Sequence, residues 1–214
     1  MNIIKKIIPD YAVIPLGAML LLNATVFWGT RVITDNRIHY DLSGLLDYHI
    51  PFVPLFIIPY ILAFVQWTVG YIVIARRGKE YCNMVMGGEM ISKLIVGIIF
   101  LILPTIMLRE KVAGNDVFSQ AVILIYKIDP PTNLFPSIHC LESYICMKSA
   151  LEMKDLDKRY RITMVVMSVL VYMSTVFIKQ HVVMDFLGAV IVAEAGRFLA
   201  EFLYANRKFI FEKG

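Results

Sequence analysis

The sequence predicts an all-α fold, a polytopic membrane protein whose six transmembrane helices form one bundle. The chain of 214 residues is 58% hydrophobic and 18% charged, with a mean hydropathy of +0.68. A soluble domain of this length is normally less apolar and more charged. The apolar residues also lie in long runs separated by short charged patches, which is typical of polytopic helical membrane proteins.

Six apolar runs are long enough to cross a bilayer, which takes roughly 17–25 residues per helix. The predicted spans are Tyr11–Gly29, Phe52–Ala75, Ile91–Leu108, Leu134–Leu151, Ile162–Ile178 and Val182–Tyr204. The first run follows two lysines, as a signal peptide would, but no small-residue cleavage site follows it. We therefore expect a retained first helix and a single membrane domain over residues 1–214.

Basic residues predict the orientation of the chain. Four basic segments fall on one side of a six-span protein: Lys5–Lys6, Arg76–Lys79, Lys154–Arg161 and Arg207–Lys213. Basic loops remain in the cytoplasm, so we expect a multi-pass protein of the cell membrane with this side cytoplasmic. The extracytoplasmic side then holds three segments: Thr30–Pro51, Arg109–Asn133 and Lys179–His181.

Charge and cysteine content limit the classes of partner. The net charge of +4 is divided between loops, which favours anionic lipid surfaces over nucleic acid. The three cysteines give no disulfide framework, and we expect buried thiols. The sequence thus predicts membrane lipids as partners and no nucleic acid, and it leaves a homo-oligomer open.

A histidine and an aspartate four residues apart flank the start of the sixth run. His181 and Asp185 share one face of a helix, where an imidazole N–H can reach the carboxylate. Such a bond fixes the imidazole tautomer and leaves the other ring nitrogen as a nucleophile or base. The alternative is an ordinary ion pair at a helix start, with an interfacial histidine.

The segment NLFPSIHC, Asn133–Cys140, begins the fourth run. Pro136 suits the first turn of a helix, where a missing N–H costs nothing. Ser137 and the neighbouring backbone N–H groups would then form an anion site at the positive helix end. His139 could donate a proton to a leaving oxygen. The alternative is an interfacial helix cap with an incidental histidine.

Two cations, Arg109 and Lys111, follow the third run. The planar guanidinium fork of an arginine matches phosphate oxygens, although both residues could simply extend toward the membrane surface. A nucleophile, a proton donor and positive charge are what phosphoryl transfer needs. No cluster in the sequence has metal-ligand spacing, so we expect a mechanism without metal or cofactor.

These residues resemble the type 2 phosphatidic acid phosphatase superfamily of integral-membrane lipid phosphatases. Its second motif, P-S-G-H, is matched by residues 136–139, with Ile138 in place of the glycine. Its third motif, S-R-x5-H-x3-D, is matched in spacing by Ser174, His181 and Asp185. The resemblance covers residues 104–188 and the six-helix architecture, which places the catalytic motifs in that range.

The resemblance implies a role for each matched residue. His181 would attack phosphorus and become a phosphohistidine, while Asp185 orients the ring and stabilises the imidazolium. His139 would protonate the leaving alkoxide and then activate the water that cleaves the intermediate. Arg109 and Ser137 would bind the phosphoryl oxygens. The resemblance also implies an extracytoplasmic site, because members of the family often act on that leaflet.

Two cations of the family motifs are missing. Thr175 stands in place of the arginine of the third motif, and the first motif, K-x6-R-P, retains only Arg109. Lys111 and Lys179 lie nearby in the sequence and could substitute, as point charges without a fork. A P-S-I-H motif without the arginine is similar to sphingolipid synthases, which pass a phospho-headgroup to a lipid alcohol. A phosphodiester carries less charge than a monoester and needs fewer cations.

The sequence therefore leaves three alternative functions. The first is a lipid phosphatase acting on a phosphomonoester or pyrophosphate. The second is a lipid phosphotransferase that uses the same histidines. The third is a catalytically silent protein that binds lipid phosphates.

Glu142, one turn after His139, either supports the site or pairs with another helix.

Overall fold

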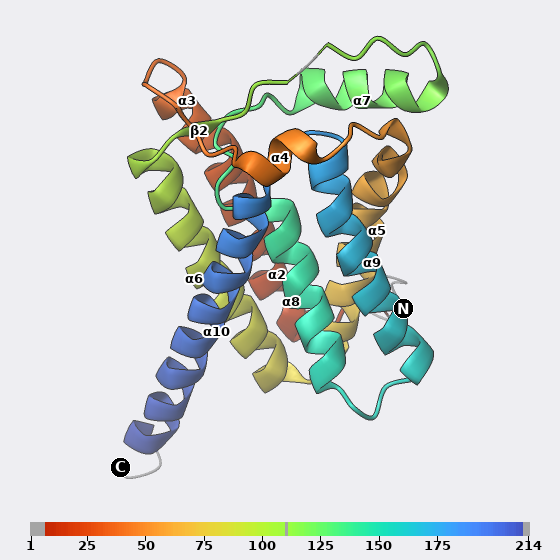
Figure 1. Ribbon diagram of the computed structural model, residues 1–214. Coiled ribbons are helices and arrows are strands. Elements are labelled where there is room, and N and C mark those ends of the chain that lie inside the picture. Colours follow the sequence, from red (N-terminus) through yellow and green to blue (C-terminus); the bar gives the residue numbers. More distant parts are fainter. Residues whose placement is uncertain (1–6, 110, 212–214) are drawn as a thin grey trace.

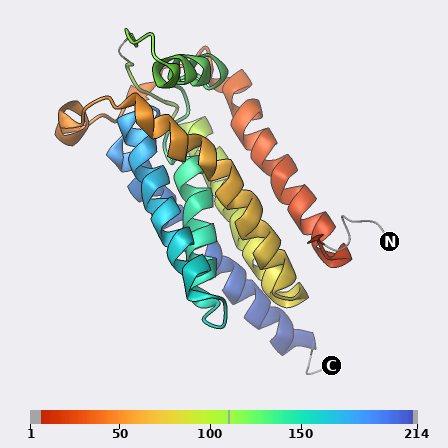
Figure 2. The ribbon, with the colours of Figure 1, turned by 90° about the vertical axis from the view of Figure 1, so that its right-hand side faces the viewer.

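The long helices of this protein run side by side, and one short helix lies across their ends (Figures 1 and 2). The computed structural model describes residues 7–109 and 111–211, with the backbone alone for 207–211. The helices are α2 (Asp10–Ala24), α3 (Thr30–Thr34), α4 (Leu45–His49), α5 (Ile57–Arg76), α6 (Lys79–Ile102), α7 (Val117–Ile128), α8 (Ile138–Glu152), α9 (Lys158–Phe177) and α10 (Val183–Phe211). A π-helical turn, Thr25–Gly29, joins α2 to α3, and a 3₁₀ turn, Pro54–Phe56, precedes α5.

Four helical stretches are long and apolar enough to cross a membrane: Asp10–Thr34, Pro54–Arg76, Lys79–Ile102 and Lys158–Phe177. They indicate an integral membrane protein, and the mostly helical fold is as expected. The two remaining predicted spans also coincide with helices. However, α8 has only 15 residues, and α10 carries ionisable side chains at Asp185, Glu194 and Arg197. Six spans in one bundle therefore remain a prediction.

The predicted boundaries of the third span were wrong. The helix α6 begins at Lys79 and ends at Ile102. Glu89, which the prediction left before the span, is buried inside the bundle together with Lys93. Pro104 follows the helix end, as prolines often do. The chain then forms a short strand, β2 (Thr105–Ile106), parallel to β1 (Tyr40–Asp41).

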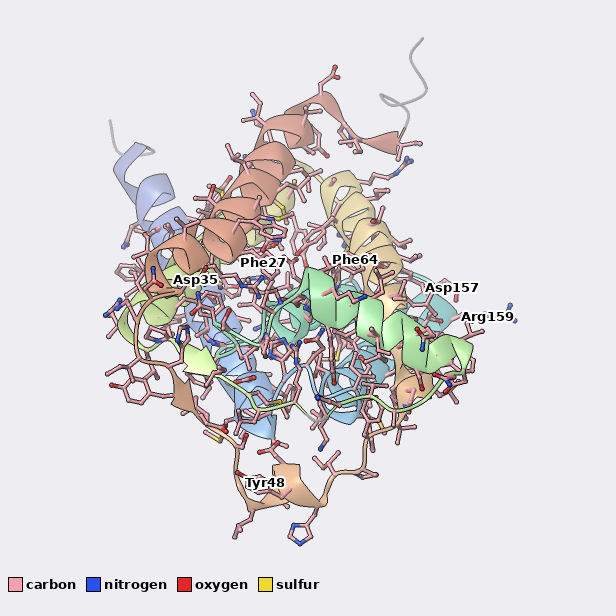
Figure 3. All side chains as sticks on the ribbon, turned by 90° about the horizontal axis from the view of Figure 1, so that it is seen from above. Phe27, Asp35, Tyr48, Phe64, Asp157 and Arg159 are labelled. Carbon is pink, nitrogen blue, oxygen red and sulfur yellow. The ribbon has the colours of Figure 1, made fainter. Side chains whose placement is uncertain are left out.

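The helix α7 lies across one end of the bundle, which we call the α7 end (Figure 1). Asp116 begins this helix by accepting hydrogen bonds from the N–H groups of Phe118 and Ser119 at 3.0 and 3.1 Å. Seen from above, α7 crosses the bundle and Tyr48 of α4 lies at the rim (Figure 3). The sequence did not predict this helix, because a run of 12 residues is too short for a span.

The loops within the described residues divide between the two ends as the sequence predicted, whereas Lys5, Lys6 and Lys213 lie outside the described residues. The loops after α3, β2 and α9 lie at the α7 end (Figure 1). The α5–α6 and α8–α9 junctions and the C-terminal end of α10 lie at the opposite end. Which side of a membrane each end faces stays a prediction.

Small residues bring α6 and α10 close together. A Cβ atom on Gly88 would lie 3.2 Å from the Cα of Arg197, and one on Gly196 would overlap the side chain of Ser92. Helices in membranes use small residues in this way to let their backbones approach. The close contact fixes α10, whose first turn carries Asp185.

Candidate active site

His181 and Asp185 form the expected pair. The Nδ1 atom of His181 lies 2.9 Å from Oδ2 of Asp185, and both side chains are buried. The same Oδ2 accepts the N–H of Val182 at 3.1 Å. An ionised carboxylate accepts only, so Nδ1 carries the proton and Nε2 carries the lone pair. His181 itself lies in the turn before α10 and not within the helix, so a capping aspartate orients it.

The turn before α10 is closed by backbone hydrogen bonds. Lys179 adopts a left-handed conformation with φ of 54°, of the kind that ends many helices. The N–H groups of Gln180 and His181 then both donate to the carbonyl of Thr175 at 2.9 Å. Thr175 is buried, and its hydroxyl donates to the carbonyl of Tyr172. Thr175, which stands where the resemblance leads one to expect arginine, thus supports the turn that holds His181.

His139 lies at the start of α8 in an aromatic enclosure. Its ring stacks on Tyr60 at 4.4 Å between centroids, and Phe64 and Trp67 flank it at 5.9 and 5.2 Å. The centroid of the His181 ring lies 6.2 Å away. Nε2 of His139 is buried and has no hydrogen-bond partner within the described part of the chain. The structure therefore brings the two predicted catalytic histidines together.

The segment before His139 ties α8 to α10. The helix begins at Ile138, with Ser137 as its cap, so Pro136 precedes the cap instead of lying in the first turn as expected. The Ser137 hydroxyl accepts the N–H of Cys140 at 3.3 Å, and its own N–H donates to the carbonyl of Asp185 at 3.1 Å. This N–H is thus engaged within the protein, and the bond joins the start of α8, which carries His139, to the first turn of α10, which follows His181.

Arg109 reaches the turn that holds His181. Its Nε donates to the carbonyl of Lys179 at 3.1 Å, its Nη1 donates to the carbonyl of Asp129 at 3.0 Å, and its Nη2 donates to the side chain of Gln180. The guanidinium also lies over the ring of Tyr126, 4.3 Å from its centroid. Burial lowers the pKa of Arg109, but an arginine remains charged in proteins.

The α7 end holds a cavity of about 780 Å³ beside Arg109, a volume typical of small-molecule sites. The three predicted phosphate-binding cations, Arg109, Lys111 and Lys179, all line it. Asp41 and Asp47 line it as well. The histidines do not, so the candidate site consists of a buried histidine pair and a cation-lined cavity next to the turn before α10.

Lys179 is held at the rim of this cavity. Its ammonium donates to the carbonyls of Asp47 and Ile50 at 2.9 and 2.6 Å. The carboxylate of Asp47 in turn accepts the N–H of Val183 at 2.8 Å, which caps α10. The sequence did not indicate this role for Asp47, because its place in a long polar segment gave no sign that it is buried.

The sequence also did not predict a group of hydrogen-bonded and ion-paired side chains next to His139. The hydroxyl of Tyr60, on which His139 stacks, donates to Asp129 at 3.4 Å, and Asp129 forms a 2.5 Å ion pair with the buried Arg31. Arg31 and Asp129 are far apart in the sequence and belong to no motif. The Pro130–Pro131 pair after Asp129, which indicates a rigid turn, was the one available signal.

Within the described residues, no group of three or more His, Cys, Asp or Glu side chains is arranged to hold a metal ion. The comparisons with known proteins give no relative: no family model matches the chain, and neither a curated protein nor a solved structure is significantly similar to it.

Proposed function

We propose that this chain is a membrane lipid phosphatase that hydrolyses a phosphomonoester or pyrophosphate through a phosphohistidine. The observation that carries the proposal is the buried pair His181–Asp185 with His139 facing it at 6.2 Å between ring centroids. One histidine has its tautomer fixed by a carboxylate, and the other has a ring nitrogen without a partner in the described part of the chain. A nucleophile and a proton donor need these two environments.

The proposed reaction has two steps. In the first, Nε2 of His181 attacks phosphorus, the bond to the leaving lipid oxygen breaks, and His139 gives that oxygen its proton. Asp185 balances the charge of the imidazolium. In the second, His139 takes a proton from water, and the resulting hydroxide displaces phosphate from His181. Arg109, Lys111 and Lys179 supply positive charge in the cavity next to the turn that holds His181, where it attracts the phosphate group of the substrate.

The proposal includes the topology: six helices cross the cell membrane as one bundle, with the α7 end extracytoplasmic. The basic segments Arg76–Lys79 and Lys154–Arg161 lie at the opposite end, where they favour a cytoplasmic location. The apolar part of the lipid would approach from the bilayer, while its phosphate meets the cavity at the α7 end.

A lipid phosphotransferase is the second candidate, and the environment of Thr175 favours it. This residue lies where the resemblance leads one to expect arginine, and its hydroxyl is engaged by the helix backbone. Arg109 is the one guanidinium that lines the cavity among the described residues. A phosphodiester, with one negative charge, requires less positive charge than a monoester.

Purified protein in lipid vesicles, given labelled phosphatidic acid or polyprenyl diphosphate and a lipid alcohol, separates these functions. We expect release of free phosphate. A new phospholipid without phosphate release would establish the transferase instead, and binding without turnover would indicate a silent lipid-binding protein.

The variant His181→Ala tests the mechanism in either case. We expect it to abolish turnover, whereas His49→Ala, at an exposed histidine of α4, leaves turnover unchanged. Wild-type turnover by folded His181→Ala would exclude His181 as the nucleophile.

A further inference from the structure

A buried ionisable cluster lies between α2, α5, α6 and α8, outside the proposed reaction. Lys93 of α6 donates to the side chain of Asn23 at 2.8 Å and also to the carboxylate of Glu142. The hydroxyl of Tyr71 donates to the other oxygen of Glu142. The expected alternative that Glu142 pairs with another helix is thus the one found. We call this group, together with Glu89, the α6 cluster.

Glu89 is the member of the α6 cluster without a partner. It lies one turn before Lys93 on the same helix, and its side chain is 1% exposed. Neither of its carboxylate oxygens makes a hydrogen bond to any residue that the structure describes. Glu142 and Lys93 act on it electrostatically, and the side chains of Tyr71 and Glu142 lie next to its carboxyl group, but Tyr71 gives its one hydroxyl proton to Glu142.

Among the described residues, no cation on the other helices packed against Glu89 is free to neutralise a negative charge on its carboxyl group. Arg197 of α10 and Lys148 of α8 line a small cavity together with it. Arg197 is paired with Glu152 and Glu201 at 2.8 and 2.6 Å. Lys148 is paired with Glu194 at 2.6 Å, and Glu194 also accepts the hydroxyl of Tyr144. Each of these cations already has a carboxylate partner, so neither is left to neutralise Glu89.

The α6 cluster therefore holds two carboxyl groups and one cation. If both carboxyl groups were ionised, the interior of a membrane-embedded bundle would carry a net negative charge. Burying an unpaired carboxylate costs far more than neutralising it with a proton. Glu142 has two donors and Glu89 has none, so the proton belongs on Glu89.

We propose that Glu89 is a proton-binding site in the core of the helix bundle, occupied at neutral pH and served by the small cavity beside it. A metal cation is a poorer occupant, because the ammonium of Lys93 already lies against Glu142 and would repel it. The cavity is about 10 Å³, the size of one water molecule, and a hydrated ion would not fit. This site is independent of the proposed phosphoryl chemistry.

Infrared spectroscopy of the full-length protein in vesicles at neutral pH tests the site. A protonated carboxyl group has a C=O stretching band that shifts in D₂O, and an ionised carboxylate lacks it. We expect the wild-type protein to show this band and Glu89→Gln to lose it. Glu201→Gln, which removes an exposed carboxylate paired with Arg197, should leave the band unchanged.

Two further variants give a pattern that only this arrangement predicts. In Lys93→Met both buried carboxyl groups become neutral, so the band should about double in area. In Glu142→Gln the ammonium of Lys93 has only Glu89 as a counter-ion, so Glu89 ionises and the band is lost. An unchanged band in folded Glu89→Gln would overturn the proposal. Absence of the band from the wild type, together with a melting temperature that rises with sodium, would overturn it in favour of a cation site.

Discussion

At the residue scale, one carboxylate oxygen of Asp185 accepts two hydrogen bonds that serve different purposes: one orients the imidazole of His181 and the other caps α10. Oδ2 accepts both the imidazole of His181 and the N–H of Val182, while Oδ1 is buried without a partner among the described residues. An asparagine could keep the bond to Val182 through its amide oxygen, but it would not supply the charge that stabilises an imidazolium. The two tasks can therefore be separated by mutation.

We expect Asp185→Asn to lower kcat by about 10³-fold or more, because the imidazolium loses its counter-charge and its preferred tautomer. The fold should persist, since the asparagine still caps α10. Turnover of labelled lipid together with the melting temperature checks this prediction. An equal loss of activity and of folded protein would mean that Asp185 is only a structural cap.

Arg109→Lys tests whether positive charge alone suffices at the cavity. Arg109 donates to three acceptors, and two of them belong to Lys179 and Gln180, directly before His181. A lysine cannot reproduce this planar set of bonds, so we expect kcat/KM to fall by about 10–100-fold. Arg37→Lys, at an exposed arginine of the same end, is the matched control. Equal activity of the two variants would show that the guanidinium of Arg109 has no specific role in the site.

Much of the site was predictable from the sequence where chemistry follows local spacing. The contact between His181 and Asp185 follows from their spacing of four residues in the sequence. It forms although His181 lies before the helix. The link from Arg31 through Asp129 to Tyr60 joins segments that are distant in the sequence, so spacing could not predict it. The partner of Glu142 lies on another helix, and sequence alone left two alternatives.

At the scale of single elements, helix contacts depend on glycines whose importance the sequence does not display. A Cβ atom on Gly196 would lie 2.5 Å from the carbonyl oxygen of Gly88 and 3.0 Å from the backbone nitrogen of Ser92. These are backbone atoms, which cannot move aside as a flexible side chain can. The α6–α10 contact is therefore sensitive to a single methyl group.

We expect Gly196→Ala to destabilise the protein by about 1–3 kcal/mol, the usual cost of overpacking. At this chain length the melting temperature would fall by roughly 2–4 °C per kcal/mol. Gly17→Ala is the control, because a Cβ there would meet no atom within 4 Å. A normal melting temperature for Gly196→Ala would show that α6 and α10 lie further apart.

The start of α7 should depend on pH. Hydrogen bonds from Ser119 hold the pKa of Asp116 below its ordinary value. A carboxylate with a depressed pKa stabilises the folded form above its unfolded pKa of about 3.9 and loses that contribution as the pH falls through the folded pKa. We expect the first-turn amides of α7 to exchange faster, relative to their intrinsic rates, below about pH 4.

Asp116→Asn provides the comparison for this exchange experiment. Asparagine caps a helix about as well as aspartate but does not titrate in this range. The variant should therefore lack the pH dependence. The same dependence in both proteins would assign the effect to another group.

At the scale of the whole molecule, the hydropathy pattern predicted the helical membrane fold but not the arrangement of its α7 end. The long apolar runs all coincide with helices, because burial and bilayer crossing both require apolar length. The position of α6 was misjudged, since polar residues that face the interior resemble a helix boundary in a linear sequence. The α7 helix and the β1–β2 pair depend on tertiary contacts.

The orientation can be tested because the native thiols leave little background. Cys82, Cys140 and Cys146 are buried and free. We expect Asn115→Cys, at an exposed position beside α7, to react with an impermeant thiol reagent on intact cells. Asp155→Cys, at the opposite end, should react only after permeabilisation. The reverse labelling would place the α7 end in the cytoplasm.

The bond between the N–H of Ser137 and the carbonyl of Asp185 gives the bundle a mechanical property. It joins the first turns of α8 and α10, which diverge toward the opposite end (Figure 1). When a bilayer thins or thickens, transmembrane helices change their tilt. The ends of α8 and α10 that are far from this hydrogen bond then move most, and the linked ends move least. His139 in the first turn of α8 and His181 in the turn before α10 both lie beside this link, so we expect the distance between their imidazoles to change little when the two helices tilt.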